Sequence, residues 1–205
     1  MLYNLNMKYK RIKLPYTYDS LEPYLDARTV EIHYTKHHAA YEANFNKGLE
    51  GTKYYDMDNV LEVMSVYNEI PEELKPVVAK QGGGLVNHNF FFNQFRKDYS
   101  HEEGNLRDAF FQNYPGGQSK FIEDFTNVSL KVFGSGWAWA VIHDGKSQII
   151  TTPNQENPWM QGITNVVFGV DLWEHSYYLK YQQDRKSYVK ACIELFILKT
   201  NAKKH

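Results

Sequence analysis

The sequence predicts an α+β protein in which a helical region comes first and a small sheet with helices around it follows. Three observations predict this class. Residues 26–50 and 57–69 show helical patterns, Asp144-Gly145 lies between two apolar runs, and the β-branched run NVVFGVDLW follows at 165–173. Helices followed by strands are typical of an α+β chain. A helical domain joined to an α+β domain is therefore expected.

The helical region begins with a clear start signal. Asp26 stands where it would cap a helix beginning at Ala27, and good helix formers without proline continue to residue 50. Leu49 and Gly51 mark the end of this helix. Apolar residues then recur at helical spacing over 57–69, before Pro71 ends the second helix.

A third helix is expected to carry buried aromatic side chains. The stretch QGGGLVNHNFFFNQFRKD spans residues 81–98. Glycines are unfavourable inside helices, so Gly82, Gly83 and Gly84 are expected at the start of the helix or at a point of close packing. From His88 onward the run is expected to be a buried helix.

The second half opens with a polar boundary. YSHEEGN at 99–105 contains Gly104, so a domain boundary is placed near it, followed by helices around 105–113 and 118–131. Asp-Gly between two apolar runs is a strong signal for a β-hairpin. The β-branched run that follows predicts a third strand, and a last helix is expected over about 185–198.

Composition excludes several classes of protein. The chain has 205 residues, with 23 Lys plus Arg against 24 Asp plus Glu, so its net charge of −1 gives no reason to expect nucleic acid or a membrane as partner. The single cysteine, Cys192, excludes an intramolecular disulfide and a cysteine metal cluster. No run is apolar enough for a membrane helix or a signal peptide. A soluble, cytoplasmic protein is expected.

Histidines gather in one short stretch near the N-terminus. EIHYTKHHAAY at 31–41 holds His33, His37 and His38, and His33 and His37 share a helix face because they lie four residues apart. His88 stands among phenylalanines in NHNFFF.

Near the C-terminus, the segment GVDLWEHSYY contains an acidic residue and a histidine four residues apart, Asp171 and His175. A carboxylate held near histidines forms a nitrogen and oxygen ligand set that suits Mn, Fe or Zn. The alternative is ordinary: a histidine in an aromatic helix is more often a hydrogen-bonded core residue. The same ligand types also suit a hydrolytic zinc site. The residues alone predict a metal site and leave its reaction open.

Four segments together resemble the iron/manganese superoxide dismutases. They are LPYTYDSLEPYLDARTVEIHYTKHHAAY, NHNFFF, FGSGWAWAVI and GVDLWEHSYYLKYQQDR, which run in order from Leu14 to about Cys192. The resemblance implies an N-terminal α-helical hairpin domain at 1–100 and a C-terminal α/β domain at 101–205. The second domain would contain a small antiparallel three-stranded sheet, with one metal ion between the domains.

The resemblance also implies the ligands and the reaction. The four protein ligands match His33, His88, Asp171 and His175, with a bound water or hydroxide as the fifth. The metal would alternate between +3 and +2. One superoxide would be oxidised to dioxygen and a second reduced to hydrogen peroxide.

Five further residues match catalytic positions of that family. His37 and Tyr41 match the gateway of the substrate channel, and Gln155 matches an amide bonded to the bound solvent. Glu174 matches a glutamate that bonds a ligand histidine across a dimer interface. Tyr178 matches a tyrosine that meets the partner's gateway histidine, so a homodimer or homotetramer is expected.

The position of the amide favours manganese. Iron-type members usually supply it four residues before the second ligand histidine, where this chain has Gly84, whereas manganese-type members supply it from the segment that matches TPNQENP, which contains Gln155. An iron-loaded or either-metal dismutase is the alternative. A metal-binding structural protein without turnover is a more distant one.

Two positions depart from the family pattern. Leu85 stands where manganese-type members often carry a ring, and Phe92 replaces a tryptophan that commonly lines the metal pocket. Both residues are apolar, so altered packing and altered product inhibition are expected.

Overall fold

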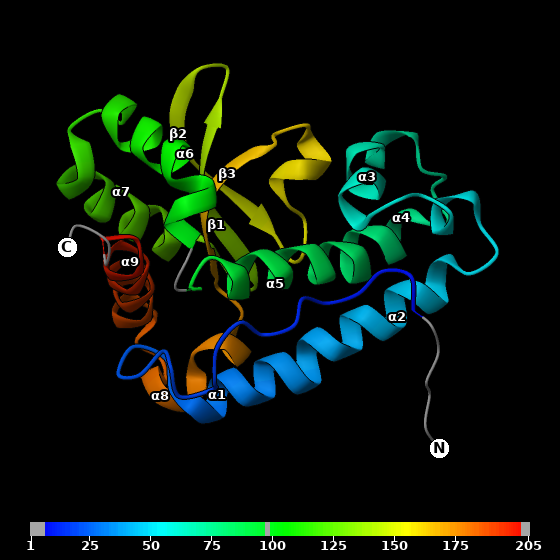
Figure 1. The fold of residues 1–205 in the computed structure, drawn as a ribbon, viewed down its shortest axis with the longest axis horizontal. Helices are drawn as coiled ribbons and strands as arrows, with labels where there is room; N and C mark the ends of the chain where they lie inside the picture. The colour runs from blue at the N-terminus through cyan, green and yellow to red at the C-terminus, as the bar shows by residue number, and fades with distance from the viewer. Residues whose placement is uncertain (1–6, 97–98, 202–205) are drawn as a thin grey trace.

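The computed structural model describes residues 7–96 and 99–201, and it confirms the predicted fold class. Helices form the first half, and the second half adds a three-stranded antiparallel sheet with helices beside it (Figure 1). Within the described ranges, no helix is long and apolar enough to cross a membrane.

One long helical segment opens the fold. It consists of α1 (Ala27–Ile32), the π-helical η1 (His33–His38) and α2 (Ala39–Leu49). Its start is the predicted one, because the Asp26 side chain accepts a hydrogen bond from the Thr29 amide. Its predicted end is confirmed as well, and Gly51 follows with a φ of 77°.

The returning arm of the first half is built from short helices and one longer one. They are η2 (Lys53–Tyr55), α3 (Val60–Ser65), η3 (Tyr67–Glu69), α4 (Lys75–Val77), η4 (Val78–Gly82) and α5 (Gly83–Asn93). The α2 and α5 helices lie side by side and run in opposite directions (Figure 1). This pair is the predicted helical hairpin.

The second half begins with two helices and continues into the sheet. Its elements are α6 (Tyr99–Asn113), α7 (Gly117–Lys131), β1 (Gly136–His143), β2 (Lys146–Pro153), η5 (Pro158–Gln161), β3 (Asn165–Asp171), η6 (Glu174–Ser176), α8 (Tyr178–Tyr181) and α9 (Arg185–Asn201). The α6 helix starts before the predicted residue 105, and Gly104 lies inside it. The division of the chain at 100/101 stays a prediction.

The sheet has β1 in the middle, paired antiparallel with β2 and with β3. Asp144 and Gly145 join β1 to β2 with φ angles of 49° and 70°, which is the left-handed backbone that a tight two-residue hairpin requires. The predicted hairpin is therefore confirmed. Its register pairs Trp137 with Thr152, and on the other side Trp137 pairs with Asp171.

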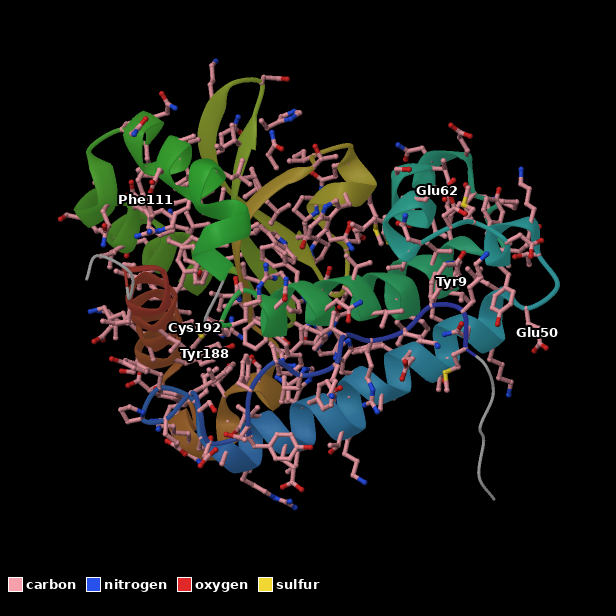
Figure 2. All side chains as sticks on the ribbon, viewed as in Figure 1. Tyr9, Glu50, Glu62, Phe111, Tyr188 and Cys192 are labelled. Carbon is pink, nitrogen blue, oxygen red and sulfur yellow. The ribbon has the colours of Figure 1, made fainter. Side chains whose placement is uncertain are left out.

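Two hydrophobic cores share the α5 helix. Tyr9 belongs to the smaller core of the first half, whereas Tyr188 and Cys192 on α9 belong to the larger core around the sheet (Figure 2). Leu85 on α5 contributes to the first core, and Phe92 contributes to the second. His88 lies between them in sequence, so this helix brings it to the junction of the two halves.

A buried glutamine fastens α5 to β3. The Gln94 amide donates to the Gly169 carbonyl at 2.8 Å and accepts from the Gly169 amide at 3.0 Å. This pair of bonds imitates the pairing of two strands and satisfies a backbone unit inside the core. Asp171 follows Gly169 on the same strand, so the bond also sets its position relative to α5.

The cap at Asp26 can be tested by mutation. Asp26 accepts from the Thr29 amide at 2.9 Å and from the Thr29 hydroxyl at 2.5 Å. We expect Asp26→Ala to lower the free energy of unfolding by about 1 kcal/mol, since an amide at the helix start loses its partner. Asp26→Asn should retain most of the stability. Urea unfolding measures both variants, and equal losses in the two would contradict capping as the cause.

Candidate metal centre

Four side chains from four separate elements converge at the junction of the two halves. His33 opens η1, His88 lies within α5, Asp171 ends β3, and His175 lies in η6. One ligand atom from each of these residues lies within 4.8 Å of the others. The structure thus brings together the four residues that the resemblance assigns as ligands.

The three imidazoles face one carboxylate oxygen. The Nε2 atoms of His33, His88 and His175 lie 3.2, 3.4 and 3.2 Å from Asp171 Oδ2. The side chains of His33, His88 and Asp171 are almost completely buried, and that of His175 is 15% exposed. The centre is therefore closed to bulk solvent on most sides.

Neighbouring groups fix the orientation of two ligands. His88 Nδ1 lies 2.6 Å from the Gly84 carbonyl, which only accepts, so Nδ1 carries the proton and Nε2 presents a lone pair. The Trp173 amide donates to Asp171 Oδ1 at 2.9 Å, which leaves Oδ2 for the site. Outer bonds of this kind are typical of metal ligands.

The donor atoms fit a cation. Among the described residues, Asp171 Oδ2 and the Nε2 atoms of His33, His88 and His175 are buried without a hydrogen-bond partner. Lone pairs and a carboxylate oxygen at these distances repel one another unless a cation or a proton lies between them, and leaving them bare in a protein interior is costly. Three nitrogens and one oxygen suit manganese, iron or zinc.

The protonation states also suit a metal. Burial lowers the pKa of His33 from 6.5 to about 3, so its imidazole is neutral near pH 7. Burial by itself would raise the pKa of Asp171, but in the metal-free chain the charge and the hydrogen bonds of histidines that carry a proton outweigh burial and hold that pKa well below 3.8. Neutral imidazoles and an ionised carboxylate are the forms that bind metal ions.

A chain of hydrogen bonds lies next to the ligands. Gln155 Nε2 donates to the Tyr41 hydroxyl at 3.0 Å, while Gln155 Oε1 accepts from Trp137 Nε1 at 3.0 Å and from Asn87 Nδ2 at 3.1 Å. The Tyr41 ring lies 5.1 Å from the His88 ring. Burial raises the pKa of Tyr41 to about 12, so its hydroxyl remains protonated near neutral pH.

The two remaining histidines of the N-terminal stretch take different places. His37 stacks on His175 with ring centroids 4.1 Å apart, and its half-buried position lowers its pKa to about 4. His38 is fully buried and stacks on Phe92 at 5.6 Å. His37 thus contacts a ligand without belonging to the group of converging atoms, and neither residue is part of the four-residue set.

Aromatic rings enclose the centre. Trp137 meets the His88 ring edge-on at 5.4 Å, and Trp139 stacks behind Trp137 at 5.0 Å. Phe92 packs against His33 at 5.2 Å. Phe92 therefore forms part of the wall, whereas Leu85 packs into the core of the first half.

Glu174 and Tyr178 lie at the surface of the chain. Tyr178 is 45% exposed, and Glu174, directly before the ligand His175, is exposed too. The contacts expected of both residues involve a partner subunit, so they stay predictions at this point.

Sequence reasoning missed two groups that hold the ligands. The carbonyl of Gly84 and the side chain of Gln94 position His88 and β3. The role of the Gly84 carbonyl could not be predicted from the sequence, because every residue has a backbone carbonyl. A signal for Gln94 existed, since an uncharged polar side chain within the aromatic run FFFNQF needs a buried partner.

Comparisons with known proteins agree with this geometry. Residues 8–96 match the iron/manganese superoxide dismutases, alpha-hairpin domain, and residues 102–204 match the C-terminal domain of the same family. "Superoxide dismutase [Mn/Fe] 2" of Staphylococcus aureus strain Mu50 / ATCC 700699 is 40% identical over 185 residues. These residues cover 90% of this chain and 91% of that protein, and the protein of the same name from strain N315 matches equally.

A buried nitrogen and oxygen ligand set between a helical hairpin and an α+β region is typical of a metal-binding protein, and the family matches make it an oxidoreductase. The chain belongs to the iron/manganese superoxide dismutase family, as the four sequence segments predicted. It is an enzyme that acts on superoxide, and its cofactor is manganese or iron.

The low pKa of His33 predicts how the metal-free chain responds to acid. The unfolded chain takes up a proton below pH 6.5, whereas the folded chain excludes it down to about pH 3. Stability is therefore complete above pH 6.5 and is lost as the pH falls through this window. Between pH 7 and pH 5 we expect His33 by itself to remove roughly 2 kcal/mol of the unfolding free energy, and His37, whose pKa is also lowered, to add to the loss.

Urea unfolding of the metal-free chain between pH 7 and pH 5 measures this dependence. In His33→Gln the buried position no longer titrates, so the loss should be clearly smaller. Equal pH dependence in the variant and the parent chain would contradict His33 as the source.

Proposed function

We propose that the protein is a manganese superoxide dismutase, with His33, His88, Asp171 and His175 as the ligands of one ion per subunit. The observation that carries this proposal is the convergence of four buried donor atoms beside the Tyr41–Gln155 hydrogen bond. The bound manganese would supply the one-electron oxidation and reduction that the two halves of dismutation require.

The source of the amide supports manganese over iron. Gln155 reaches Tyr41 from the segment after β2, as expected for manganese-type members of the family. At position 84, the alternative source, an added Cβ would lie 2.4 Å from Tyr41 Cδ1. A glutamine at position 84 therefore has no room beside Tyr41 as it is placed here.

Tyr41 and Gln155 are proposed to handle protons. Tyr41 keeps its proton because its pKa is raised to about 12, and Gln155 Nε2 already donates to its oxygen. The hydroxyl proton of Tyr41 is thus available to a group in the site. Reduction of superoxide to hydrogen peroxide needs two protons, and a hydroxyl held at the edge of the centre can pass one on.

His37 is proposed to border the path of substrate to the centre. It is half-buried and stacks on His175, the most exposed of the four ligands. Superoxide, being small, can approach along this side, where the ligand shell is least covered.

A cytoplasmic location is part of the same proposal, and cell fractionation tests it.

The function is tested by loading the protein separately with manganese and with iron at matched occupancy. We expect rapid superoxide decay with manganese and at least about tenfold slower decay with iron. The reason is that a hydrogen bond from outside the ligand shell adjusts the reduction potential of the bound metal, and one adjustment suits only one of the two metals. Pulse radiolysis measures both rates. Equal activity with the two metals would exclude manganese specificity and favour the either-metal alternative.

A ligand variant and a matched control distinguish catalysis by the protein-bound metal from catalysis by free metal ions. His33→Ala should lose bound metal and activity together, whereas His143→Ala, at the end of β1 with a side chain 42% exposed, should keep both. Metal content is read by mass spectrometry of the native protein. Full metal occupancy with no turnover in the parent chain would instead favour a metal-binding structural protein.

A homodimer is proposed to cover one exposed apolar surface. Phe133 is fully exposed, and Tyr178 and Leu179 are 45% and 57% exposed. The Arg185 guanidinium donates to the Val132 carbonyl at 2.8 Å, to the Gly134 carbonyl at 3.0 Å and to the Tyr177 hydroxyl at 3.1 Å. These bonds hold the loop at Phe133 beside α8.

The same surface would place Glu174 and Tyr178 in contact with the second subunit. Glu174 opens η6, which also carries His175, and Tyr178 opens α8 shortly after it, so a second subunit seated here would reach the ligand shell. Contiguous exposed apolar side chains are typical of a protein interface. The proposed bond from Glu174 to a ligand histidine of the partner would then join the two centres.

Light scattering of Phe133→Asp tests the dimer. We expect a substantial fall in mean mass at micromolar concentration, because a buried aspartate without a partner opposes association. Leu61→Asp is the control, since Leu61 is exposed on α3, at the opposite end of the view in Figure 1 from α8. A mass unchanged by Phe133→Asp would exclude this surface, and a fall in mass from Leu61→Asp would indicate a tetramer contact.

A further inference from the structure

A glycine on α5 lies directly against the main chain of Gln155. A Cβ added to Gly83 would lie 2.1 Å from the Gln155 carbonyl oxygen and 3.1 Å from its carbon. These atoms belong to the backbone, so they cannot rotate away as the end of a side chain can. Any residue other than glycine at position 83 must push the segment that carries Gln155 away from the helix.

The Gln155 carbonyl is also held in place from the same helix face. Asn87 lies one turn after Gly83, and its Nδ2 donates to the Gln155 carbonyl at 3.1 Å and to Gln155 Oε1 at 3.1 Å. A main-chain shift away from Gly83 would stretch both bonds. The missing side chain of Gly83 thus permits the close approach of the Gln155 main chain to α5, and Asn87 donates hydrogen bonds to the residue held there.

The bonds of the Gln155 side chain depend on this approach. Two donors, Trp137 Nε1 and Asn87 Nδ2, meet at Oε1, so the other end of the amide, Nε2, is the one that donates to Tyr41. All three bonds measure 3.0–3.1 Å. A displacement of roughly 1 Å would carry them beyond the range of effective hydrogen bonds.

We propose that Gly83 is a positioning residue for Gln155: its missing side chain sets the distance between α5 and the segment after β2, and so aims the amide at Tyr41. Gly83 touches neither the substrate nor the ligands and acts only through Gln155. The inference rests on the proposed role of Gln155 in catalysis. Its test below reads the position of Gln155 directly and does not depend on turnover.

The indole N–H of Trp137 reports on Gln155, because it donates to Oε1. The experiment compares parent and Gly83→Ala as full-length chains labelled with ¹⁵N and loaded with Zn²⁺, a diamagnetic ion that takes nitrogen and oxygen ligands. In Gly83→Ala the Trp137 indole signal should move, and its hydrogen exchange should become about tenfold faster, the factor expected for one lost hydrogen bond. The Gln94 side-chain amide is the internal reference, because it donates to the Gly169 carbonyl on β3 and makes no bond to the segment that carries Gln155.

Gly82→Ala is the matched control. It also adds a methyl group to a glycine of the same helical segment, but this Cβ would meet the Phe45 ring at 2.6 Å and the Met64 methyl at 2.9 Å, which are side-chain atoms. We expect it to leave the Trp137 signal and its exchange unchanged. A folded Gly83→Ala chain with the parent Trp137 signal would overturn the proposal, as would equal acceleration at the Trp137 indole and the Gln94 side-chain amide.

A second variant covers the case in which Gly83→Ala does not fold. Pro153→Gly, at the end of β2, releases the backbone before Gln155 so that the carbonyl can retreat from the added methyl group. The double variant should then fold with a displaced Trp137 signal, while Pro153→Gly alone keeps the parent signal. A folded double variant with the parent Trp137 signal would also overturn the proposal.

The test of Gly83 as a positioning residue can be distinguished from the test of Gln155 as a catalytic residue. If Gln155→Ala retained full superoxide activity, the catalytic role of Gln155 would fail while the Trp137 result stood. If Gln155→Ala lost activity and Gly83→Ala left Trp137 unmoved, only the positioning role would fail.

Discussion

The structure depends on one buried electrostatic arrangement, the meeting of Asp171 with three imidazoles. A carboxylate that has left water must be compensated, and here its Oδ2 faces the Nε2 atoms of three imidazoles. A cation compensates all four groups at once. Because the ligands come from η1, α5, β3 and η6, the ion would join the two halves of the chain as well as serve the reaction.

The packing around the centre serves this arrangement. The α5 helix belongs to both cores and carries His88 between them, and Gln94 fastens its end to the strand that carries Asp171. The glycines at the start of α5 allow two other elements to come within contact distance, one of them bearing Tyr41 and the other Gln155. The four converging residues and the Tyr41–Gln155 pair are therefore placed with the help of the same helix.

Much of this could be predicted from the sequence, for definite reasons. The Asp26 cap and the Asp144-Gly145 turn are local devices, so their structures follow from a few neighbouring residues. The four residues of the candidate metal centre were predicted through the similarity of long segments to a known family, since their spacing alone left a core histidine or a zinc site open. The start of α6 was placed too late, because the polar composition and Gly104 resembled a linker although the segment is helical.

By itself, the sequence determined the fold class and the family, and it predicted the four residues that converge at the candidate metal centre, because capping, turn chemistry and specific motifs depend on neighbouring residues. Only the tertiary structure decided that Gly83 lies against the Gln155 carbonyl, that Gln94 pairs with Gly169, and that Phe133 is left uncovered beside α8. These relations join residues far apart in the chain. Their geometry depends on how whole helices and strands pack, at distances where a single methyl group changes the result.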